Sequence, residues 1–473
     1  MSNTIGSDPV PKPSAQARGN AGARVTLSPL GGAGTSVLVD TGHARVLVDC
    51  GASPALAAFD ASTLDAVVLT HAHPQHADGL AALAHNGFTG VLIATPYTLR
   101  MADIGLRDAL LTRQENEGPA AAAERAATRT GPGPALPDDD PAAIAATVAA
   151  LGIGREFGDP AVIAPGVSCT LHRAGHALGS AWVHFDLGAA GTLAVSGDLG
   201  RHGHPLLRHP EPFTHADTVL VEAAYGEGRR AASDDRDHLA HTVFTTLDQG
   251  GTVLVPAGPV DHIATVLFEL ARLRRVGCLP DGVTVCFDGP TGLESVGVWR
   301  DALLARDPEL HDAVLDAGFG ALDVGVLTEV RGARPGAHPS GSGGGIVVAG
   351  PHHGDGGRAA RHLRELLPDP RNAVLLQGRS PVGTAAHALA RGATEVRIGK
   401  DIVPVRAEIA RLPGMTTHAD AGEIIEWLGR GTEPNMTYVV HGSPGARVAL
   451  RDRIRNTLDW NAEILAGDAV LGR

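Results

Sequence analysis

Short apolar runs alternate with glycine-rich turns in the first part of the chain. Runs rich in β-branched residues occur at Val37–Asp40, Arg45–Asp49 and Asp65–Thr70. The last of these precedes Ala77–His85, in which Ala and Leu recur at helical spacing. Strands that alternate with helices are typical of α/β folds, so we expect a layered α/β domain here.

A second α/β block is expected after Gly200. Its apolar strands are predicted at Thr218–Val221, Thr252–Val255, Val283–Phe287, Ile346–Ala349 and Asn372–Leu376, and its helices include His262–Arg274 and Gly357–Leu367. The alternation predicts a separate layered unit.

Three segments lack this periodicity. Residues 1–23 are rich in Ser, Pro, Gly, Ala and Asn, which predicts a disordered N-terminal segment. Residues 115–140 are Ala-rich and charged before Pro and Gly interrupt them, which predicts a helix followed by an exposed loop. Residues 335–345 are mainly Gly, Ser and Pro with no GxxxxGK[ST] after them, so we expect a surface loop and not a phosphate-binding loop.

Length and composition narrow the class of protein. A chain of 473 residues exceeds one ordinary domain and predicts roughly two to three compact units. Four cysteines without a CxxC pair argue against a disulfide framework or a cysteine zinc ribbon and favour a reducing cytoplasm. We see no signal peptide and no apolar run of about 18 residues, so we expect a soluble protein without a membrane partner.

The charge balance argues against a broad nucleic-acid surface. The net charge is −13 and aromatic residues make up 3% of the chain. Neither a global basic face nor an extensive base-stacking platform is therefore expected. Any binding of RNA needs a local groove.

Three histidines follow the apolar run Asp65–Leu69 within six positions. They are His71, His73 and His76, and a predicted helix comes directly after them. Imidazole is a good zinc ligand, and a loop at a strand end leaves side chains free to converge on one or two ions. A single histidine is more commonly a core or surface residue, but three at this spacing predict a metal centre.

Three further segments carry ligand-type side chains at or near the ends of apolar runs. Glycines flank His176 and allow its loop to approach a metal closely, while Asp198 and His441 each end an apolar run. Asp198 by itself is better explained as a turn residue or helix cap. Four separate segments with ligand-type residues nevertheless predict one shared centre.

These segments together resemble the metallo-β-lactamase superfamily, and specifically its β-CASP group of RNA- and DNA-processing nucleases, which includes the mRNA 3′-end endonuclease. The similar segments are Thr70–His76, His172–Ala181, Ser196–Arg201, Val221–Gly226, Gly354–Arg358, Gly378–Thr384, Val405–Glu408, Thr416–Asp420 and His441–Gly442. The resemblance extends from about Val25 to the C-terminus. It implies a metallo-β-lactamase αββα sandwich at 24–229 and 408–473, with an inserted α/β β-CASP domain at 230–407.

The resemblance also implies the metal ligands. A first zinc ion would be held by His71, His73, His176 and Asp198, and a second by His76, Asp198 and His441. Asp49 would support the ligands by hydrogen bonds, although an ordinary turn role is the alternative.

Two further residues are implied to take part in the reaction. Glu222 would orient groups around the metal centre, with a buried structural role as its alternative. His418 would contact the scissile phosphate or protonate the leaving oxygen.

Gln75 stands where the family signature has an aspartate. An amide offers a neutral oxygen and no anion, so the second ion should bind less tightly, or one ion only should be held. Asp78 is an uncertain replacement ligand, since its simpler role is to place negative charge in the first turn of a helix.

The resemblance favours a β-CASP ribonuclease that hydrolyses single-stranded RNA with a metal-activated water. Arg358, Arg406 and Ser380 are expected to contact substrate between the domains, and a homodimer is a possible assembly. Two alternatives stay open. One is a catalytically weakened homologue that serves as a scaffold for RNA or a partner nuclease; the other is a hydrolase of a small ester, thioester or lactone.

Overall fold

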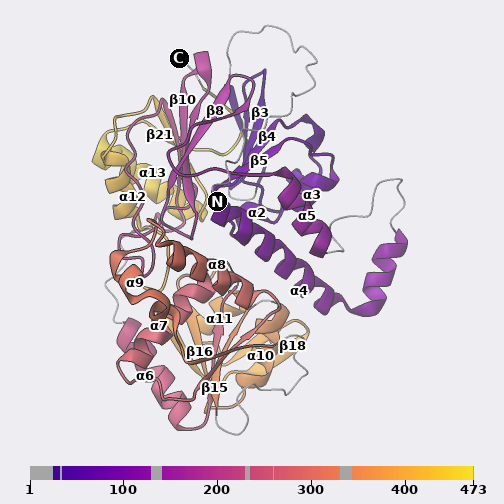
Figure 1. Ribbon diagram of the computed structural model, residues 1–473, viewed down its shortest axis with the longest axis vertical. Helices are drawn as coiled ribbons and strands as arrows, with labels where there is room; N and C mark the ends of the chain where they lie inside the picture. The colour runs from indigo at the N-terminus through magenta and orange to yellow at the C-terminus, as the bar shows by residue number, and fades with distance from the viewer. Residues whose placement is uncertain are drawn as a thin grey trace, which may run out of the picture.

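The computed structural model describes residues 25–31, 35–128, 141–228, 235–258, 260–330, 344–354 and 356–471, without the side chains of 116–128. The predicted disordered segment 1–23 and the loop at 129–140 lie outside the described residues, as does all but the end of the loop predicted at 335–345. The described chain forms two domains, which occupy the upper and lower halves of Figure 1.

The first domain contains two seven-stranded sheets. The first sheet has the order β22 (Ala469–Leu471), β1 (Val25–Pro29), β2 (Val37–Asp40), β3 (Arg45–Val48), β4 (Ala66–Val68), β5 (Val91–Ala94) and β6 (Gly152–Gly154). The second has the order β21 (Ala462–Ile464), β20 (Met436–Val440), β11 (Thr218–Glu222), β10 (Thr192–Val195), β9 (Ala181–Asp186), β8 (Val167–Arg173) and β7 (Ala161–Ala164). Buried side chains of both sheets, such as Val46 and Val183, form one apolar core between them.

Helices cover the outer faces of the two sheets. The helices beside the first sheet are α1 (Pro54–Ala57), α2 (Pro74–Ala77), α3 (Leu80–His85), α4 (Pro96–Thr128) and α5 (Pro141–Leu151). On the second sheet, α12 (Ala421–Gly429) and α13 (Pro444–Leu458) bury Ile424 and Leu450 against Val219. Short 3₁₀ turns occupy Ala61–Thr63 and Gly188–Ala190. This arrangement confirms the expected αββα sandwich.

The inserted domain has a six-stranded sheet, all of whose pairs are parallel among the described strands. Its order is β14 (Val326–Val330), β13 (Thr284–Asp288), β15 (Gly345–Ala349), β12 (Thr252–Pro256), β16 (Ala373–Gln377) and β19 (Glu408–Leu412). Its helices are α6 (Asp235–Asp248), α7 (His262–Arg275), α8 (Gly292–Ala305), α9 (Asp312–Ala317), α10 (Gly357–Leu366) and α11 (Ala385–Ala390), with a 3₁₀ turn at Gly318–Leu322 and a ribbon of β17 (Glu395–Ile398) and β18 (Asp401–Pro404). Parallel strands require such crossovers, so the prediction of a second α/β unit is confirmed.

Three predicted boundaries differ from the observed ones. β19 pairs with β16, so the sheet of the inserted domain continues to Leu412, beyond the boundary expected at 407. β11 lies between β10 and β20 and belongs to the first domain, although its sequence was grouped with the second block. The helix expected over Ala77–His85 is interrupted at Gly79, whose backbone N–H donates to the Cys50 carbonyl instead of continuing α2.

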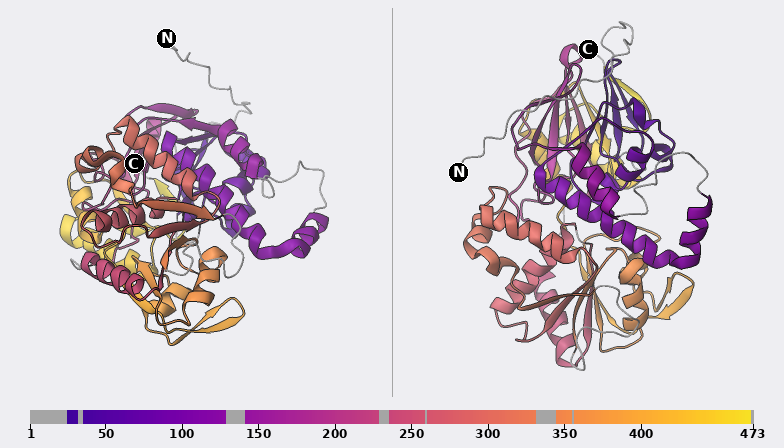
Figure 2. Two further views of the ribbon diagram at one scale, coloured as in Figure 1. Left: turned by 60° about the horizontal axis from the view of Figure 1, so that its bottom comes forward. Right: turned by 45° about the vertical axis from the view of Figure 1, so that its right-hand side comes forward.

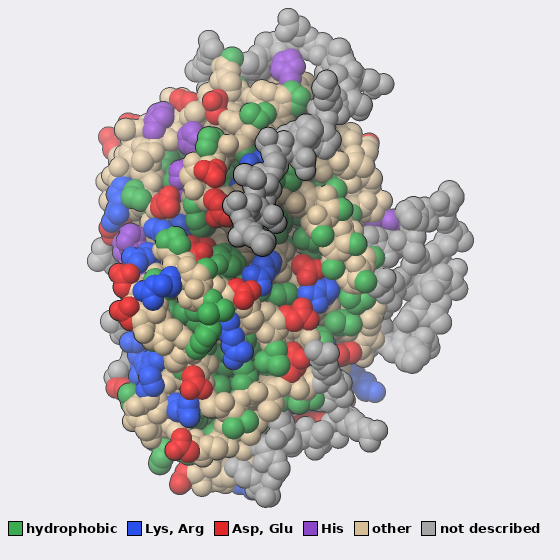
Figure 3. All heavy atoms as spheres, viewed as in Figure 1, with side chains coloured by type: hydrophobic (Ala, Val, Ile, Leu, Met, Phe, Trp, Pro, Cys, Tyr) green, Lys and Arg blue, Asp and Glu red, His purple; other side chains and the backbone are tan. Residues whose placement is uncertain are grey.

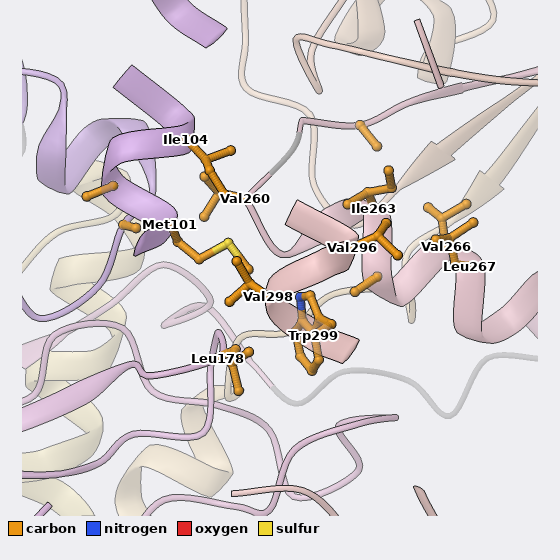
Figure 4. Close-up of a cluster of buried hydrophobic side chains, with 14 of the residues drawn as sticks. Met101, Ile104, Leu178, Val260, Ile263, Val266, Leu267, Val296, Val298 and Trp299 are labelled. Carbon is orange, nitrogen blue, oxygen red and sulfur yellow. The ribbon is translucent and has the colours of Figure 1, made fainter. Parts of the chain in front are cut away.

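The long helix α4 joins the two domains. It leaves the first domain and runs beside α8 and α10 of the inserted domain (Figures 1 and 2). Met101 and Ile104 of α4 pack against Val260, Val298 and Trp299 in a continuous buried cluster (Figure 4). None of the described helices is both long and apolar enough to cross a bilayer.

Candidate metal centre

The predicted ligands meet in the segments that follow four strands of the first domain. His71, His73 and His76 follow β4, while the other three follow β8, β10 and β20. Ligand atoms of His71, His73, His176 and Asp198 all lie within 4.8 Å of one another, as do those of His76, Asp198 and His441. Both expected ligand sets are thus brought together, with Asp198 shared between them.

The spacing of the ligand atoms suits a metal ion. The Asp198 Oδ2 atom lies 3.5 Å from Nε2 of His71, 3.4 Å from Nε2 of His76 and 3.8 Å from Nε2 of His176. The His176 Nε2 and His73 Nδ1 atoms are 3.1 Å apart. Ligands about 2.0–2.1 Å from a tetrahedral ion lie about 3.3 Å from one another, so these separations fit.

Several of these buried atoms have no hydrogen-bond partner. Among the described residues, Nε2 of His71, Nε2 of His76 and both carboxylate oxygens of Asp198 make no hydrogen bond, although they lie within ion-pair distance of one another. Buried polar atoms in proteins are nearly always hydrogen-bonded. A cation bound among these atoms would accept their free lone pairs, so the residues fit a metal ion.

Hydrogen bonds from Asp49 and Thr70 orient two of the imidazoles. The Asp49 Oδ2 atom lies 2.8 Å from His76 Nδ1, and the same carboxylate accepts hydrogen bonds from the backbone N–H and hydroxyl of Thr70 at 2.7 and 2.8 Å. The Thr70 hydroxyl lies 3.0 Å from His71 Nδ1. Asp49 therefore reaches two ligands, one of them through Thr70, which the sequence interpretation missed.

The hydroxyl of Thr417 contacts a second imidazole, that of His176. The Thr417 Oγ1 atom lies 3.2 Å from His176 Nδ1. Thr417 comes directly before His418, as Thr70 comes directly before His71. A hydroxyl beside a candidate active-site histidine is the sequence signal that could have found both residues.

Burial keeps most of the imidazoles neutral. It lowers the pKa of His71 and of His176 well below the ordinary value, and it lowers the pKa of His73 to about 3. Neutral imidazole is the form that binds a cation.

His76 and Asp198 form the charged pair of the centre. Burial opposes the protonated form of His76, but the Asp198 and Asp49 carboxylates prevail and raise its pKa to about 10. Burial likewise opposes ionisation of Asp198, yet His76 and His441 hold the pKa of that carboxyl well below its usual range. Asp198 therefore supplies negative charge to both ligand sets.

A third group of ligand-type side chains also includes Asp198. Atoms of His418 and Glu222 gather with Asp198, and the His418 Nδ1 atom is 3.8 Å from Glu222 Oε1 and 3.9 Å from Asp198 Oδ2. Burial opposes the charged imidazolium, but the nearby Glu222 and Asp198 carboxylates prevail and raise the pKa of His418. Glu222 also accepts hydrogen bonds from the backbone N–H groups of Leu199 and Ala224. Glu222 can therefore both support the surrounding backbone and orient His418.

The two uncertain ligands lie outside these groups. Gln75 is exposed in the first turn of α2, whereas His76 in the same turn is buried. Asp78 ends α2 instead of starting a helix, and burial raises its pKa to about 7. It acts electrostatically on buried Cys50 and joins none of the ligand groups found among the described residues. The second set therefore has three protein ligands.

One of the predicted substrate contacts needs correction, and a second stays a prediction. Arg358 is 2% exposed and donates to Asp108 and Glu115 at 3.2 and 2.7 Å, so its guanidinium is neutralised by α4. Arg406 is exposed but precedes β19, while the loop to His418 leaves the opposite end of that strand.

Ser380 lies in a loop that a chain of contacts links to His418. Its carbonyl is 3.1 Å from His387 Nδ1, and Gly378 in the same loop adjoins Tyr225 and Thr416. Tyr225 in turn lies beside the ring of His418. Ser380 therefore stays a predicted substrate contact.

Two ligand sets that share one carboxylate, at the open end of an αββα sandwich and beside an inserted α/β domain, define a metallohydrolase. Family models match the metallo-beta-lactamase superfamily at residues 29–237, the Beta-Casp domain at 263–389 and the Zn-dependent metallo-hydrolase RNA specificity domain at 402–465. The chain belongs to the β-CASP group of the metallo-β-lactamase superfamily.

Curated relatives match most of the chain. The chain is 29% identical over 436 residues to the ribonuclease TTHA0252 of Thermus thermophilus, which covers 88% of this chain and 92% of the relative. It is 25% identical over 452 residues to the transcription termination factor FttA of Pyrococcus abyssi, which covers 87% of this chain and 65% of that factor. The FttA factor of Methanothermobacter thermautotrophicus is 25% identical over 445 residues, 89% of this chain and 66% of the factor. The chain thus spans about two thirds of these two termination factors.

Proposed function

We propose that the protein is a zinc-dependent ribonuclease that hydrolyses phosphodiester bonds of single-stranded RNA. The observation that carries the proposal is the third group, in which His418 and Glu222 meet the metal ligand Asp198. Metal ligands alone serve many hydrolases, but an imidazole and a carboxylate beside the centre suit a reaction that must protonate a leaving oxygen.

Zinc is the proposed ion because three imidazoles and one carboxylate form the first ligand set. When bound, such ions lower the pKa of water and neutralise charge on phosphate. The second set, His76, Asp198 and His441, is proposed to bind its ion more weakly since it offers one ligand fewer.

The protein's own groups have distinct proposed roles. Asp49, Thr70 and Thr417 fix the imidazole rings, so that little reorganisation is needed during the reaction. Glu222 holds His418, which gives a proton to the leaving oxygen.

RNA is the proposed substrate class because a family model described as an RNA specificity domain matches residues 402–465, which include His418. The first-set ligands are buried, so a phosphodiester must enter a recess to reach them. An unpaired strand can do so more readily than a rigid duplex. Acidic and basic side chains are mixed on the face in Figure 3, so a local groove, and not a broad basic face, is the proposed binding route.

The test measures metal content and RNA cleavage together. Purified protein is analysed for bound metal and then incubated with an end-labelled single-stranded RNA and with a 4-nitrophenyl ester. We expect bound zinc and RNA cleavage that His73→Ala and His418→Ala abolish or reduce at least about 100-fold. His43→Ala, which changes an exposed histidine in a turn, is the matched control and should cleave like the wild type.

Other outcomes would overturn the proposal. Metal-free protein that regains no activity with added zinc excludes both enzyme hypotheses. RNA binding without cleavage at any metal load favours a scaffold. Ester hydrolysis without RNA cleavage favours a small-molecule hydrolase.

A further inference from the structure

A strained turn of the inserted domain lies at Asp261. Its φ is 66° and its ψ is −50°, and the His262 N–H donates to the Val260 carbonyl at 2.8 Å. These features define a γ-turn of the rare, strained kind. Five described residues other than glycine have a positive φ, and Asp49 and His441 at the metal centre are among them. Strain of this kind is retained where function requires it.

The carboxylate of Asp261 is buried without a partner. The residue is 1% exposed, and neither carboxylate oxygen has a hydrogen-bond partner among the described residues. Burial raises the pKa of Asp261 to about 7. An unsatisfied buried carboxylate is costly, so a donor that joins it on ligand binding would recover that energy.

Contacts on both sides place this turn over the first ligand set. The His262 ring stacks on His73, with ring centroids 5.3 Å apart, and its other face stacks on His352 at 4.5 Å. The charge of His418 is close enough to act on the Asp261 carboxylate. Val260, just before the turn, packs against Ile104 of α4 (Figure 4). The packing therefore holds the turn of Asp261 next to the candidate metal ligand His73, which the neighbouring His262 contacts.

The chemistry of RNA limits what this carboxylate can accept. A phosphodiester has no hydrogen-bond donor and repels a carboxylate. Donors on a nucleotide are the ribose 2′-hydroxyl and the amino and imino groups of the bases. The 2′-hydroxyl is present at every position and lies on the carbon next to the phosphate-bearing one, whereas the donors of the bases change with sequence and lie farther from the phosphate.

We propose that Asp261 accepts a hydrogen bond from the ribose 2′-hydroxyl of a nucleotide next to the scissile phosphate and thereby selects RNA over DNA. The proposal rests on the proposed ribonuclease function. Asp261 is in this view a specificity-determining residue supplied by the inserted domain, whereas the metal ligands come from the first domain.

The test uses one oligonucleotide sequence in an all-ribose form and in forms with a single 2′-deoxy position on either side of the mapped cleavage point. For the zinc-loaded wild type we expect one deoxy position to slow cleavage about 10-fold or more, since a hydrogen bond to a charged group is lost. Asp261→Ala should slow cleavage of the all-ribose strand by a similar factor and lose the further effect of the deoxy position. Asp316→Asn, an exposed carboxylate of the same domain, is the control and should keep the wild-type ratio.

Binding provides a readout that does not depend on cleavage. Fluorescence anisotropy in the His73→Ala background should show weaker binding of the deoxy strand, and adding Asp261→Ala, which removes the acceptor, should remove that difference. The proposal is wrong if Asp261 variants leave the ribose-to-deoxyribose ratio unchanged in both assays, or if their effect follows base identity instead. If the wild type cleaves no RNA, the proposed function fails, but the anisotropy ratio still decides whether Asp261 reads the 2′-hydroxyl.

Discussion

The carboxylate of Asp49 orients two proposed metal ligands, His76 directly and His71 through Thr70. Its positive φ ends β3 and turns the side chain toward Thr70 and His76. An aspartate in this conformation costs backbone energy, which its three hydrogen-bonding contacts offset. The orientation of both imidazoles therefore depends on a residue that is not itself in a ligand group.

Asp49→Asn tests this dependence. The amide keeps an acceptor for Thr70 but lacks the charge that holds His76, so metal affinity should fall about 10- to 100-fold. Competition with a chromophoric chelator measures the affinity, and circular dichroism checks the fold. Asp186→Asn, an exposed aspartate at the end of β9, is the matched control. Equal affinity in Asp49→Asn and the wild type would assign Asp49 to the turn alone.

Individual residues differed in how far the sequence could predict them. The six candidate metal ligands could be predicted from the sequence, because each follows or ends a short apolar run and matches a family segment. Arg358 could not, because its partners Asp108 and Glu115 lie 250 and 243 positions away in the chain. An arginine in a motif has the same sequence signal whether it binds a phosphate or a carboxylate.

At the scale of elements, the loop after β10 meets two other loops at Gly200. Its N–H donates to the Ala174 carbonyl at 2.8 Å, and its backbone forms a bridge with His418. A Cβ at this position would lie 1.8 Å from the Gly175 carbonyl oxygen. The glycine in this motif therefore lets the loops of His176 and Asp198 approach each other.

Gly200→Ala should push these loops apart. The clash is with backbone, which cannot swing away like a side chain, so we expect a loss of about 1–3 kcal/mol in the free energy of unfolding and weaker binding at the first ligand set. Urea denaturation and chelator competition measure the two effects. Gly297→Ala, in α8 with open space around it, should instead stabilise by about 0.5–1 kcal/mol. A Gly200→Ala variant as stable as the wild type would show that the loops can separate without cost.

The elements themselves were mostly predictable, and their ends were less so. β2 and β12 follow the apolar runs closely, because a buried strand needs an apolar run of its own length. The break between α2 and α3 was missed because helical spacing continues through Gly79. Only the neighbouring Cys50 backbone, which a Cβ at Gly79 would meet at 2.5 Å, gives the reason for a glycine there.

At the scale of the whole molecule, α4 ties the inserted domain to the first. Buried Arg358 of α10 pairs with Asp108 and Glu115 of α4, and Arg107 of α4 pairs with Glu294 of α8. The relative position of Asp261 and the metal ligands therefore depends on α4.

Arg358→Met tests the strength of this connection. The change leaves the Asp108 carboxylate without its counter-ion and Glu115 with Arg361 alone, so the free energy of unfolding should fall by about 3 kcal/mol. Chemical denaturation measures the change, and Arg391→Met, at an exposed position, should stay within about 0.5 kcal/mol of the wild type. Adding Asp108→Asn should restore part of the loss, because it removes one uncompensated charge. If the double variant is no more stable than Arg358→Met, the pair is not the source of the effect.

The amino-acid sequence by itself determined the two-domain α/β class, the family and the ligand types, because apolar periodicity and short motifs are local properties of the chain. The homodimer expected from the sequence stays a prediction. Tertiary structure decided which side chains meet: it paired Arg358 with carboxylates of α4, left Gln75 exposed and placed the turn of Asp261 beside His73 through the ring of His262. The reason is physical, since burial and charge depend on neighbours contributed by distant parts of the chain.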